Sequence, residues 1–269
     1  MLRSNLMDDL YSLDPIRQIS AISQIQDEDN NLAIPYLIEL LSSSDKDVKF
    51  CAIEALGHLA DTTDELVGDA LMKTLINSDS ISKSEILDIL SDLGYKPATG
   101  LVVNLLLNDL DWLVRVSAAE ALSCIANKGD IGVISALELA LDDPIEPVRS
   151  FSACAIGILA ISESRLINKL EVYFTSEESM GTKAEILGAK YRLGVQEDLM
   201  RILKLLVIAE DDDILKILNA INDLVTRSTP VSIGKNLKYI REYFSELLNK
   251  NSQYHRKCEE IIHSIAILI

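Results

Sequence analysis

One short segment is repeated along this chain, and its copies carry acidic side chains at fixed positions. In one copy a histidine occupies such a position. In copies that start at positions 48, 82, 114 and 148, offsets 3, 6 and 10 from the start lie on one helical face. The charged residues at these offsets in the first three copies are Glu54, His58, Glu85, Asp88, Asp92 and Glu120. Carboxylates grouped on one surface attract cationic side chains and speed their encounter. We therefore expect an acidic groove that binds a basic protein partner.

The fourth copy places apolar residues at the same offsets. Phe151, Cys154 and Ile158 occupy them, and an apolar floor would hold a partner that charge has steered into the groove. The alternative for all these positions is an ordinary solvated helix face. Two interpretations also stay open for Trp112, the only tryptophan: an exposed anchor for the partner, or a cover over the junction of neighbouring repeats.

A second set of acids precedes each copy of the segment. Its members are Asp45, Asp47, Asp79, Asp109, Asp111, Asp142, Asp143, Glu177, Glu178 and Asp211 to Asp213. Carboxylates at a helix N-terminus accept its free N–H groups, so this ridge is expected to be structural, with Lys49, Arg115, Arg149 and Lys183 paired to it. The alternative is a second partner surface.

Motifs of enzymes and metal sites are missing from the sequence. It contains no Gly-rich phosphate loop and no nucleophile elbow. His255, Cys258, Glu259 and His263 share a face of the last helix, but this spacing is what any helix stripe gives. We expect a non-enzymatic chain with no cofactor and no metal.

Helical hairpins must position these residues. Ile34, Leu37, Ile38 and Leu41 follow the i, i+3, i+4, i+7 pattern of a first helix. A second helix buries the stripe Val48, Ala52, Ala55, Leu56 and Leu59. The pair returns every 32 to 34 residues, which predicts an all-α solenoid of about seven to eight hairpins.

The chain is expected to form one continuous solenoid. Residues 1–227 hold the repeat array, and residues 228–269 hold a C-terminal capping helical pair that covers the end of the stack. The apolar tail from Ile265 to Ile269 should pack on the preceding helix or serve as a docking strip. Ser82-x-x-Glu85 and Thr182-x-x-Glu185 are capping-box patterns and predict helix N-termini at Ser82 and Thr182.

Composition narrows the class of partner. The net charge is −17: residues 1–227 hold 38 Asp or Glu against 19 Lys or Arg, whereas residues 228–269 hold four Glu against six Lys or Arg. Such a body repels nucleic-acid phosphates. Four widely spaced cysteines indicate reduced thiols, and no apolar run is long enough for a membrane span. We expect a soluble cytoplasmic protein that binds neither nucleic acid nor membrane.

The repeated unit resembles a known family. Residues 33–41 read Ala-Ile-Pro-Tyr-Leu-Ile-Glu-Leu-Leu, and an Asp-rich turn, Val-Lys or Val-Arg, and Ala-x-Glu-Ala-Leu-Gly follow. This resembles the short bacterial HEAT repeats of phycobilisome lyase subunits and many adaptor proteins. The resemblance implies a curved right-handed superhelix whose second helices line the concave side.

Several functions follow from charge and from this resemblance. The leading hypothesis is a protein-binding module, and its narrower form is an immunity or antidote protein that neutralises a toxin domain. The resemblance implies, as an alternative, a bilin lyase-like subunit or chromophore chaperone. A HEAT-like DNA glycosylase needs a cationic concave face, which the acidic groove opposes. The HEAT-repeat hydroxylase of deoxyhypusine uses His-Glu dipeptides as iron ligands, and here the three histidines precede Leu59, Arg256 and Ser264.

Overall fold

The computed structural model describes residues 4–28, 30–61, 64–161, 164–230, 232–250 and 252–267. Within these ranges the chain forms sixteen α-helices and four short 3-10 turns, and no strand. The α-helices are α1 (Ser4–Leu10), α2 (Pro15–Asp27), α3 (Ile34–Leu40), α4 (Lys46–Leu59), α5 (Glu65–Leu75), α6 (Ser80–Asp92), α7 (Thr99–Asn108), α8 (Trp112–Ile125), α9 (Ile131–Ala140), α10 (Glu146–Leu159), α11 (Ser164–Ser176), α12 (Met180–Arg192), α13 (Asp198–Ile208), α14 (Asp211–Thr226), α15 (Leu237–Lys250) and α16 (His255–Ile267).

The helices pair in chain order. Each odd-numbered helix packs against the even-numbered helix that follows it, which gives eight hairpins in the described part of the chain. We call the odd-numbered helices A helices and the even-numbered ones B helices. The predicted all-α solenoid of seven to eight hairpins is confirmed.

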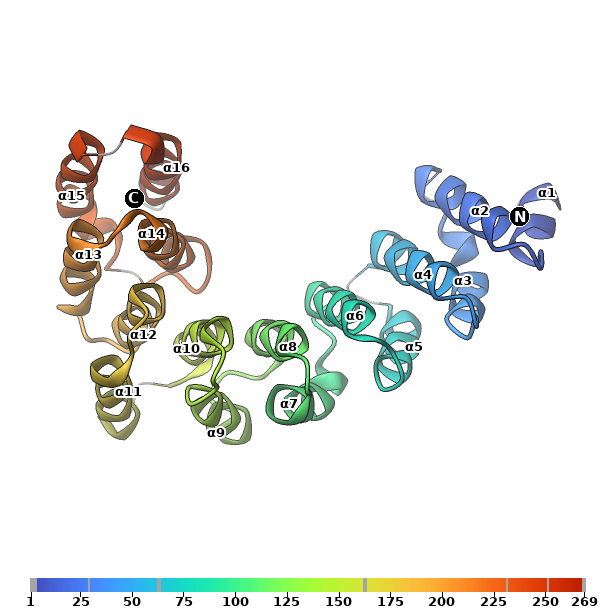
Figure 1. The fold of residues 1–269 in the computed structure, drawn as a ribbon, viewed down its shortest axis with the longest axis horizontal. Coiled ribbons are helices and arrows are strands. Elements are labelled where there is room, and N and C mark those ends of the chain that lie inside the picture. Colours follow the sequence, from blue (N-terminus) through green and yellow to red (C-terminus); the bar gives the residue numbers. More distant parts are fainter. Residues whose placement is uncertain are drawn as a thin grey trace. The chain divides into compact units, whose positions relative to one another are not determined.

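The hairpins group into two compact units, Met1–Ile125 and Ala126–Ile269. In unit 1 the B helices α2, α4, α6 and α8 pack on one another in succession, and in unit 2 α10, α12, α14 and α16 do the same (Figure 1). Within residues 228–269, α15 packs against α13 and α16 against α14. The predicted terminal pair therefore continues the stack of unit 2.

The buried stripe of each B helix holds its hairpin together. In α4, Val48, Ala52, Ala55 and Leu56 are fully buried, and Leu59 is nearly so. Small alanines let A and B helices approach closely, and the larger aliphatic side chains fill the space between neighbouring hairpins. At the end of unit 2, Ile265 is buried but Ile267 is 71% exposed, and Leu268 and Ile269 lie outside the described residues.

Helix starts differ from the capping-box prediction. The Asp79 side chain accepts the N–H of Ser82, and Ser179 accepts that of Thr182, so both helices begin earlier in the chain than predicted. Ser82 and Thr182 are buried in the first helical turn. The prediction was wrong because a better-placed acceptor precedes each motif by three residues. As a result, Glu85 and Glu185 lie well inside their helices rather than at the ends.

Among the described residues, every helix is too short or too polar to cross a bilayer.

Candidate functional site

Five carboxylates lie on three successive B helices of unit 1. They are Glu54 on α4, Glu85, Asp88 and Asp92 on α6, and Glu120 on α8, and we call this set the acidic face. Glu54, Asp88 and Asp92 are exposed, while Glu85 and Glu120 are partly buried. A hydrogen bond of 2.6 Å between the hydroxyl groups of Ser84 and Ser117 joins α6 to α8. The structure thus places the predicted acids of three different repeats on adjacent helices.

Desolvation and mutual repulsion raise the pKa of two residues of the acidic face. Partial desolvation, followed by the charges of Glu120, Glu85 and Asp92, raises the pKa of Asp88 from 3.8 to about 6. Desolvation, then Glu54 and Asp92, also raises the pKa of Glu85. Carboxylates that raise one another's pKa are close enough to repel each other. A cationic side chain brought to this surface would relieve that repulsion.

Two other predicted residues of unit 1 lie near these helices. His58 is exposed on α4. Trp112, at the start of α8, is 47% exposed, so both interpretations, an anchor for the partner and a cover over a repeat junction, stay open. An indole exposed to this degree remains available as an apolar contact.

The predicted apolar floor lies in unit 2, on α10. Phe151 and Ile158 are partly buried there. Cys154 is 4% exposed, and its Sγ donates a hydrogen bond of 3.3 Å to Asp223 Oδ2. The prediction was wrong for Cys154, because its thiol faces polar groups of α12 and α14 and does not extend an apolar patch.

The acids of the turns act mainly as helix caps. In unit 1, Asp45 accepts the N–H groups of Asp47 and Val48, and Asp79 that of Ser82. Hydrogen bonds from the Ser80 side chain and the Leu113 N–H lower the pKa of Asp111. A cavity of about 600 Å³ opens beside these caps, and its lining is Lys46, Asp47, Phe50, Asp79, Ser80, Ile81, Ser82 and Asp111.

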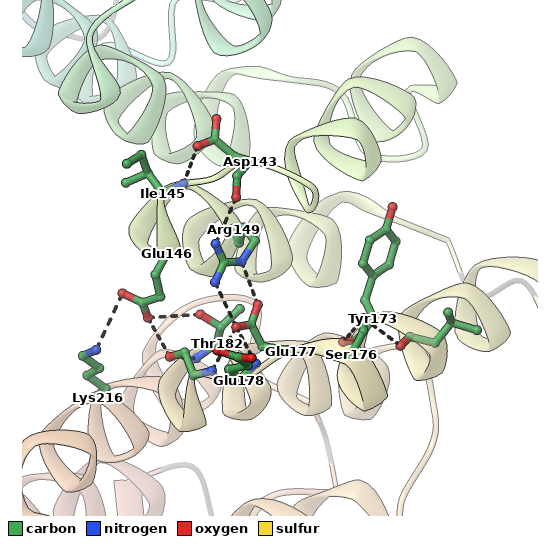
Figure 2. A network of polar contacts seen from close by, with 12 residues as sticks. Asp143, Ile145, Glu146, Arg149, Tyr173, Ser176, Glu177, Glu178, Thr182 and Lys216 are labelled. Atoms are coloured by element: carbon green, nitrogen blue, oxygen red, sulfur yellow. Dashed lines mark hydrogen bonds and ion pairs between the residues drawn. The ribbon is translucent and has the colours of Figure 1, made fainter.

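The predicted pairing of the turn acids with basic residues is clearest at Arg149. Its Nε and Nη2 donate to the two carboxylate oxygens of Glu177 at 2.7 and 2.9 Å, and its Nη1 donates to the carbonyl oxygen of Asp143 at 2.9 Å. Figure 2 shows the Arg149 guanidinium between Asp143 and Glu177, which belong to two different turns. The prediction is confirmed for Arg149.

For Arg115 the predicted pairing is electrostatic: after the hydrogen bonds to Asp111, the charge of Arg115 also lowers the pKa of that carboxyl group. Arg115 donates to the carbonyl oxygens of Asp109 and Leu110, and Lys183 lies over the ring of Phe174. Asp109 is paired at 2.6 Å with Lys83, one residue after Ser82, which the sequence analysis had not singled out.

Glu146 continues the network of Arg149. Its Oε1 accepts hydrogen bonds from the hydroxyl groups of Ser179 and Thr182, and its Oε2 lies 3.6 Å from Lys216 Nζ (Figure 2). These contacts tie α10 to α12 and α14. Arg149 and Glu146 are both paired with other side chains of this network. The network therefore stabilises the packing of these three helices.

One cluster of side chains was not predicted from the sequence. Cys154, Glu185 and Asp223, on α10, α12 and α14, offer ligand atoms that all lie within 4.8 Å of one another. Burial, followed by repulsion from Asp223, raises the pKa of Glu185 to about 8, and burial raises the pKa of Cys154 well above 9. The offset rule missed Asp223, which lies nine residues after Ile214 and not at offset 3, 6 or 10.

The possible ligand stripe of the last helix does not assemble. Cys258 is fully buried in α16, while the side chains of His255 and Glu259 are more than 60% exposed and pair with each other at 3.2 Å. The buried thiol and the exposed imidazole therefore point to different sides of the helix.

Comparisons with known proteins agree with the repeat architecture. A sequence model of the HEAT repeat matches residues 33–62, which span the hairpin of α3 and α4. The X-ray structure of the Escherichia coli protein YibA superposes with a TM-score of 0.55, at 17% identity, over 99% of this chain and 93% of that one. At this identity the likeness shows the fold alone.

The deoxyhypusine hydroxylase of Schizosaccharomyces pombe is similar over a shorter stretch. It is 27% identical over 135 residues, which are 49% of this chain and 41% of the hydroxylase. The chain thus matches less than half the length of this relative. One hairpin of the chain thus matches a HEAT repeat, and the succession of two-helix hairpins has the same kind of solenoid fold.

Proposed function

We propose that this chain is a non-enzymatic protein-binding module whose acidic face grips a basic partner. The observation that carries the proposal is the set of carboxylates on α4, α6 and α8, where desolvation and then the charges of the neighbouring acids raise the pKa values of Asp88 and Glu85. Lysine or arginine side chains placed among them would replace repulsion with charge-assisted hydrogen bonds. The net charge of −17 would steer such a partner from a distance.

Apolar contacts would supply the binding energy that charge alone does not. Trp112 belongs to the same unit as the acidic face and is 47% exposed. Tryptophan is enriched among residues that dominate binding energy, because it offers a large rigid area at low entropic cost. Phe151 and Ile158 in unit 2 are further candidates, since both are partly exposed on a B helix.

The direct test is capture of a partner from lysate of the source cells at low salt, followed by binding measurements with that protein in purified form. The triple variant Glu85→Gln, Asp88→Asn, Glu120→Gln should slow association at least about tenfold. A matched variant, Asp8→Asn, Glu39→Gln, Glu65→Gln, makes the same charge change on A helices and should bind almost normally. Equal loss in both variants, or capture of acidic proteins only, would contradict the proposal.

A narrower form of the proposal is an immunity or antidote protein for a cationic toxin domain. It rests on the same charge complementarity. Expression of the captured partner alone should arrest growth, and co-expression with this chain should restore it. The triple variant of the acidic face should fail to restore growth, while the A-helix variant should succeed.

The similarity to deoxyhypusine hydroxylase supports an enzyme as a second candidate. Against it, none of the three histidines, His58, His255 and His263, is followed by glutamate, so the dipeptides that serve that hydroxylase as iron ligands are absent. Incubation of the iron-loaded chain with the deoxyhypusine-bearing protein substrate decides between the two. Hydroxylation with multiple turnovers would replace the binding proposal with the enzymatic one.

A further inference from the structure

Three side chains of metal-ligand type converge inside unit 2, although no two of them are neighbours in sequence. Cys154 comes from α10, Glu185 from α12 and Asp223 from α14, three B helices that pack in succession. Their ligand atoms lie within 4.8 Å of one another. Ligands in a tetrahedral site are roughly 3.5 Å apart, given bonds to the metal of about 2.0–2.3 Å. Small side-chain rotations are enough to close that difference.

The packing of the protein alone leaves part of this cluster unsatisfied. Glu185 Oε2 is shielded from solvent and has no hydrogen-bond partner. Leaving a buried carboxylate oxygen unpaired destabilises the folded state, so such an atom in a folded protein indicates a missing partner. Cys154 Sγ donates a hydrogen bond to Asp223 Oδ2, so the thiol and the second carboxylate are in direct contact.

The basic residues nearby are only partly held by other contacts, since Arg192 Nε and Nη1 are buried without a hydrogen-bond partner. Arg192 Nη2 donates to the carbonyl oxygens of Asp223 and Arg227 at the C-terminus of α14, at 2.7 and 2.8 Å. Arg227 lies 3.8 Å from Asp223 Oδ2. These guanidinium groups offset part of the negative charge that a thiolate and two carboxylates would bring together. The charges of Arg192 and Arg227 oppose the rise in the pKa of Glu185, but neither group donates a hydrogen bond to Glu185 Oε2.

The helix backbones hold the ligands at a fixed separation. A Cβ atom at Gly157 would lie 2.6 Å from Ala189 Cα, so α10 and α12 approach as closely as a glycine allows. Ligands on rigid elements need little ordering when a metal binds, which favours affinity.

We propose that Cys154, Glu185 and Asp223 bind a divalent transition-metal ion of the zinc type, with water in the fourth coordination position. A soft thiolate combined with carboxylates selects such an ion over Mg²⁺ and Ca²⁺, which take oxygen ligands alone. The site belongs to unit 2 and does not depend on the acidic face of unit 1, so the two proposals fail independently.

The test is titration of the metal-free full chain with Zn²⁺ and Co²⁺, using calorimetry and absorbance. One Zn²⁺ should bind per chain, and Co²⁺ should give the near-ultraviolet absorption of a cobalt–thiolate bond. Cys154→Ser should abolish that absorption and weaken Zn²⁺ binding at least about tenfold. Cys258→Ser, which removes another buried thiol, is the matched control and should change neither.

Two further variants, Glu185→Gln and Asp223→Asn, test the proposal even if Cys154→Ser folds poorly. Each should weaken Zn²⁺ binding at least about tenfold while circular dichroism stays unchanged. Excess Mg²⁺ or Ca²⁺ should not displace the bound Zn²⁺. Equal Zn²⁺ affinity in the wild type and the three variants, or no cobalt–thiolate band in the wild type, overturns the proposal.

Discussion

Asp88 shows how a single residue records the electrostatics of the acidic face. Folding raises its pKa from 3.8 to about 6, first by desolvation and then by the neighbouring carboxylates. The folded chain therefore holds this proton more tightly than the unfolded chain does. Ionised Asp88 consequently lowers the free energy of unfolding; the loss is complete above about pH 6 and absent below about pH 3.8.

We predict that Asp88→Asn stabilises the chain at pH 7.5. The gain should stay below about 1 kcal/mol, since the side chain is exposed and water screens the repulsion. Urea midpoints at pH 7.5 and pH 4.5 test this, and the difference between variant and wild type should shrink at the lower pH. Asp8→Asn, on α1, is the control. A variant less stable than wild type at pH 7.5 would contradict the assigned repulsion.

Arg149 leads to a second prediction at the residue scale. Its guanidinium binds both oxygens of Glu177, and the side chains are only 20% and 7% exposed. Arg149→Ala should destabilise the chain by about 2 kcal/mol, because it leaves a mostly buried carboxylate without its partner. Arg256→Ala, which breaks an exposed pair with Glu260, should cost less than about 0.5 kcal/mol. Thermal and urea unfolding of both variants would check the ranking, and equal effects would contradict it.

At the residue scale, one helical register was enough to predict which acids lie within reach of one another. After desolvation, the charge of Glu54 raises the pKa of Glu85, and the charge of Glu120 raises that of Asp88. That these acids bind a partner stays a prediction. The cluster of Cys154, Glu185 and Asp223 was not predicted, because Asp223 departs from that register. In addition, a small residue such as Cys154 in an Ala-rich helix is typical of helix packing. The capping boxes were misread because Asp79 and Ser179 supply closer acceptors.

At the scale of elements, the close approach of B helices limits which side chains the chain tolerates. Gly157 on α10 faces Ala189 on α12, and an added Cβ would lie 2.6 Å from the Cα atom of that residue. Backbone cannot move aside as a flexible side chain can. The two helices would have to separate, which would disturb the packing of unit 2.

We predict that Gly157→Ala destabilises the chain by about 1–3 kcal/mol, the usual cost of overpacking. Gly188→Ala on α12 is the matched control, since its added Cβ would meet Leu224 at an ordinary 3.6 Å. It should be neutral or stabilise by up to about 1 kcal/mol, because alanine favours the helix. Denaturation followed by circular dichroism compares the two. A Gly157→Ala variant as stable as wild type would contradict the close approach.

At the scale of the whole molecule, the chain consists of two compact units. The stability of a repeat array is approximately the sum of repeat and nearest-neighbour terms, so units of this kind can unfold in separate steps. Trp112 is the only tryptophan and lies in unit 1, whereas Gly157 lies in unit 2. Tryptophan fluorescence therefore reports on unit 1 alone.

We predict that urea unfolding followed by Trp112 fluorescence and by circular dichroism gives transitions that do not coincide. Gly157→Ala should shift part of the circular dichroism transition to lower urea and leave the fluorescence transition in place. Two coincident curves that shift together would mean that the chain unfolds as one cooperative body.

The architecture of the whole molecule was predictable because a period of 32 to 34 residues repeats the same apolar spacing. The division into units at residue 125 was not, since the repeat pattern continues through that position without a linker. Likewise, Val48 and Leu56 could be placed in the core by periodicity, whereas the exposure of Trp112 depends on the neighbouring hairpin.

The most direct test of the central claim is the association rate of the captured partner with the wild-type chain as a function of salt. If the acidic face steers a basic partner, the rate should fall by at least about tenfold between 50 and 300 mM NaCl. The variant with neutralised Glu85, Asp88 and Glu120 should begin slower and depend less on salt. A rate that is independent of salt, and equal in the wild type and this variant, would contradict the account.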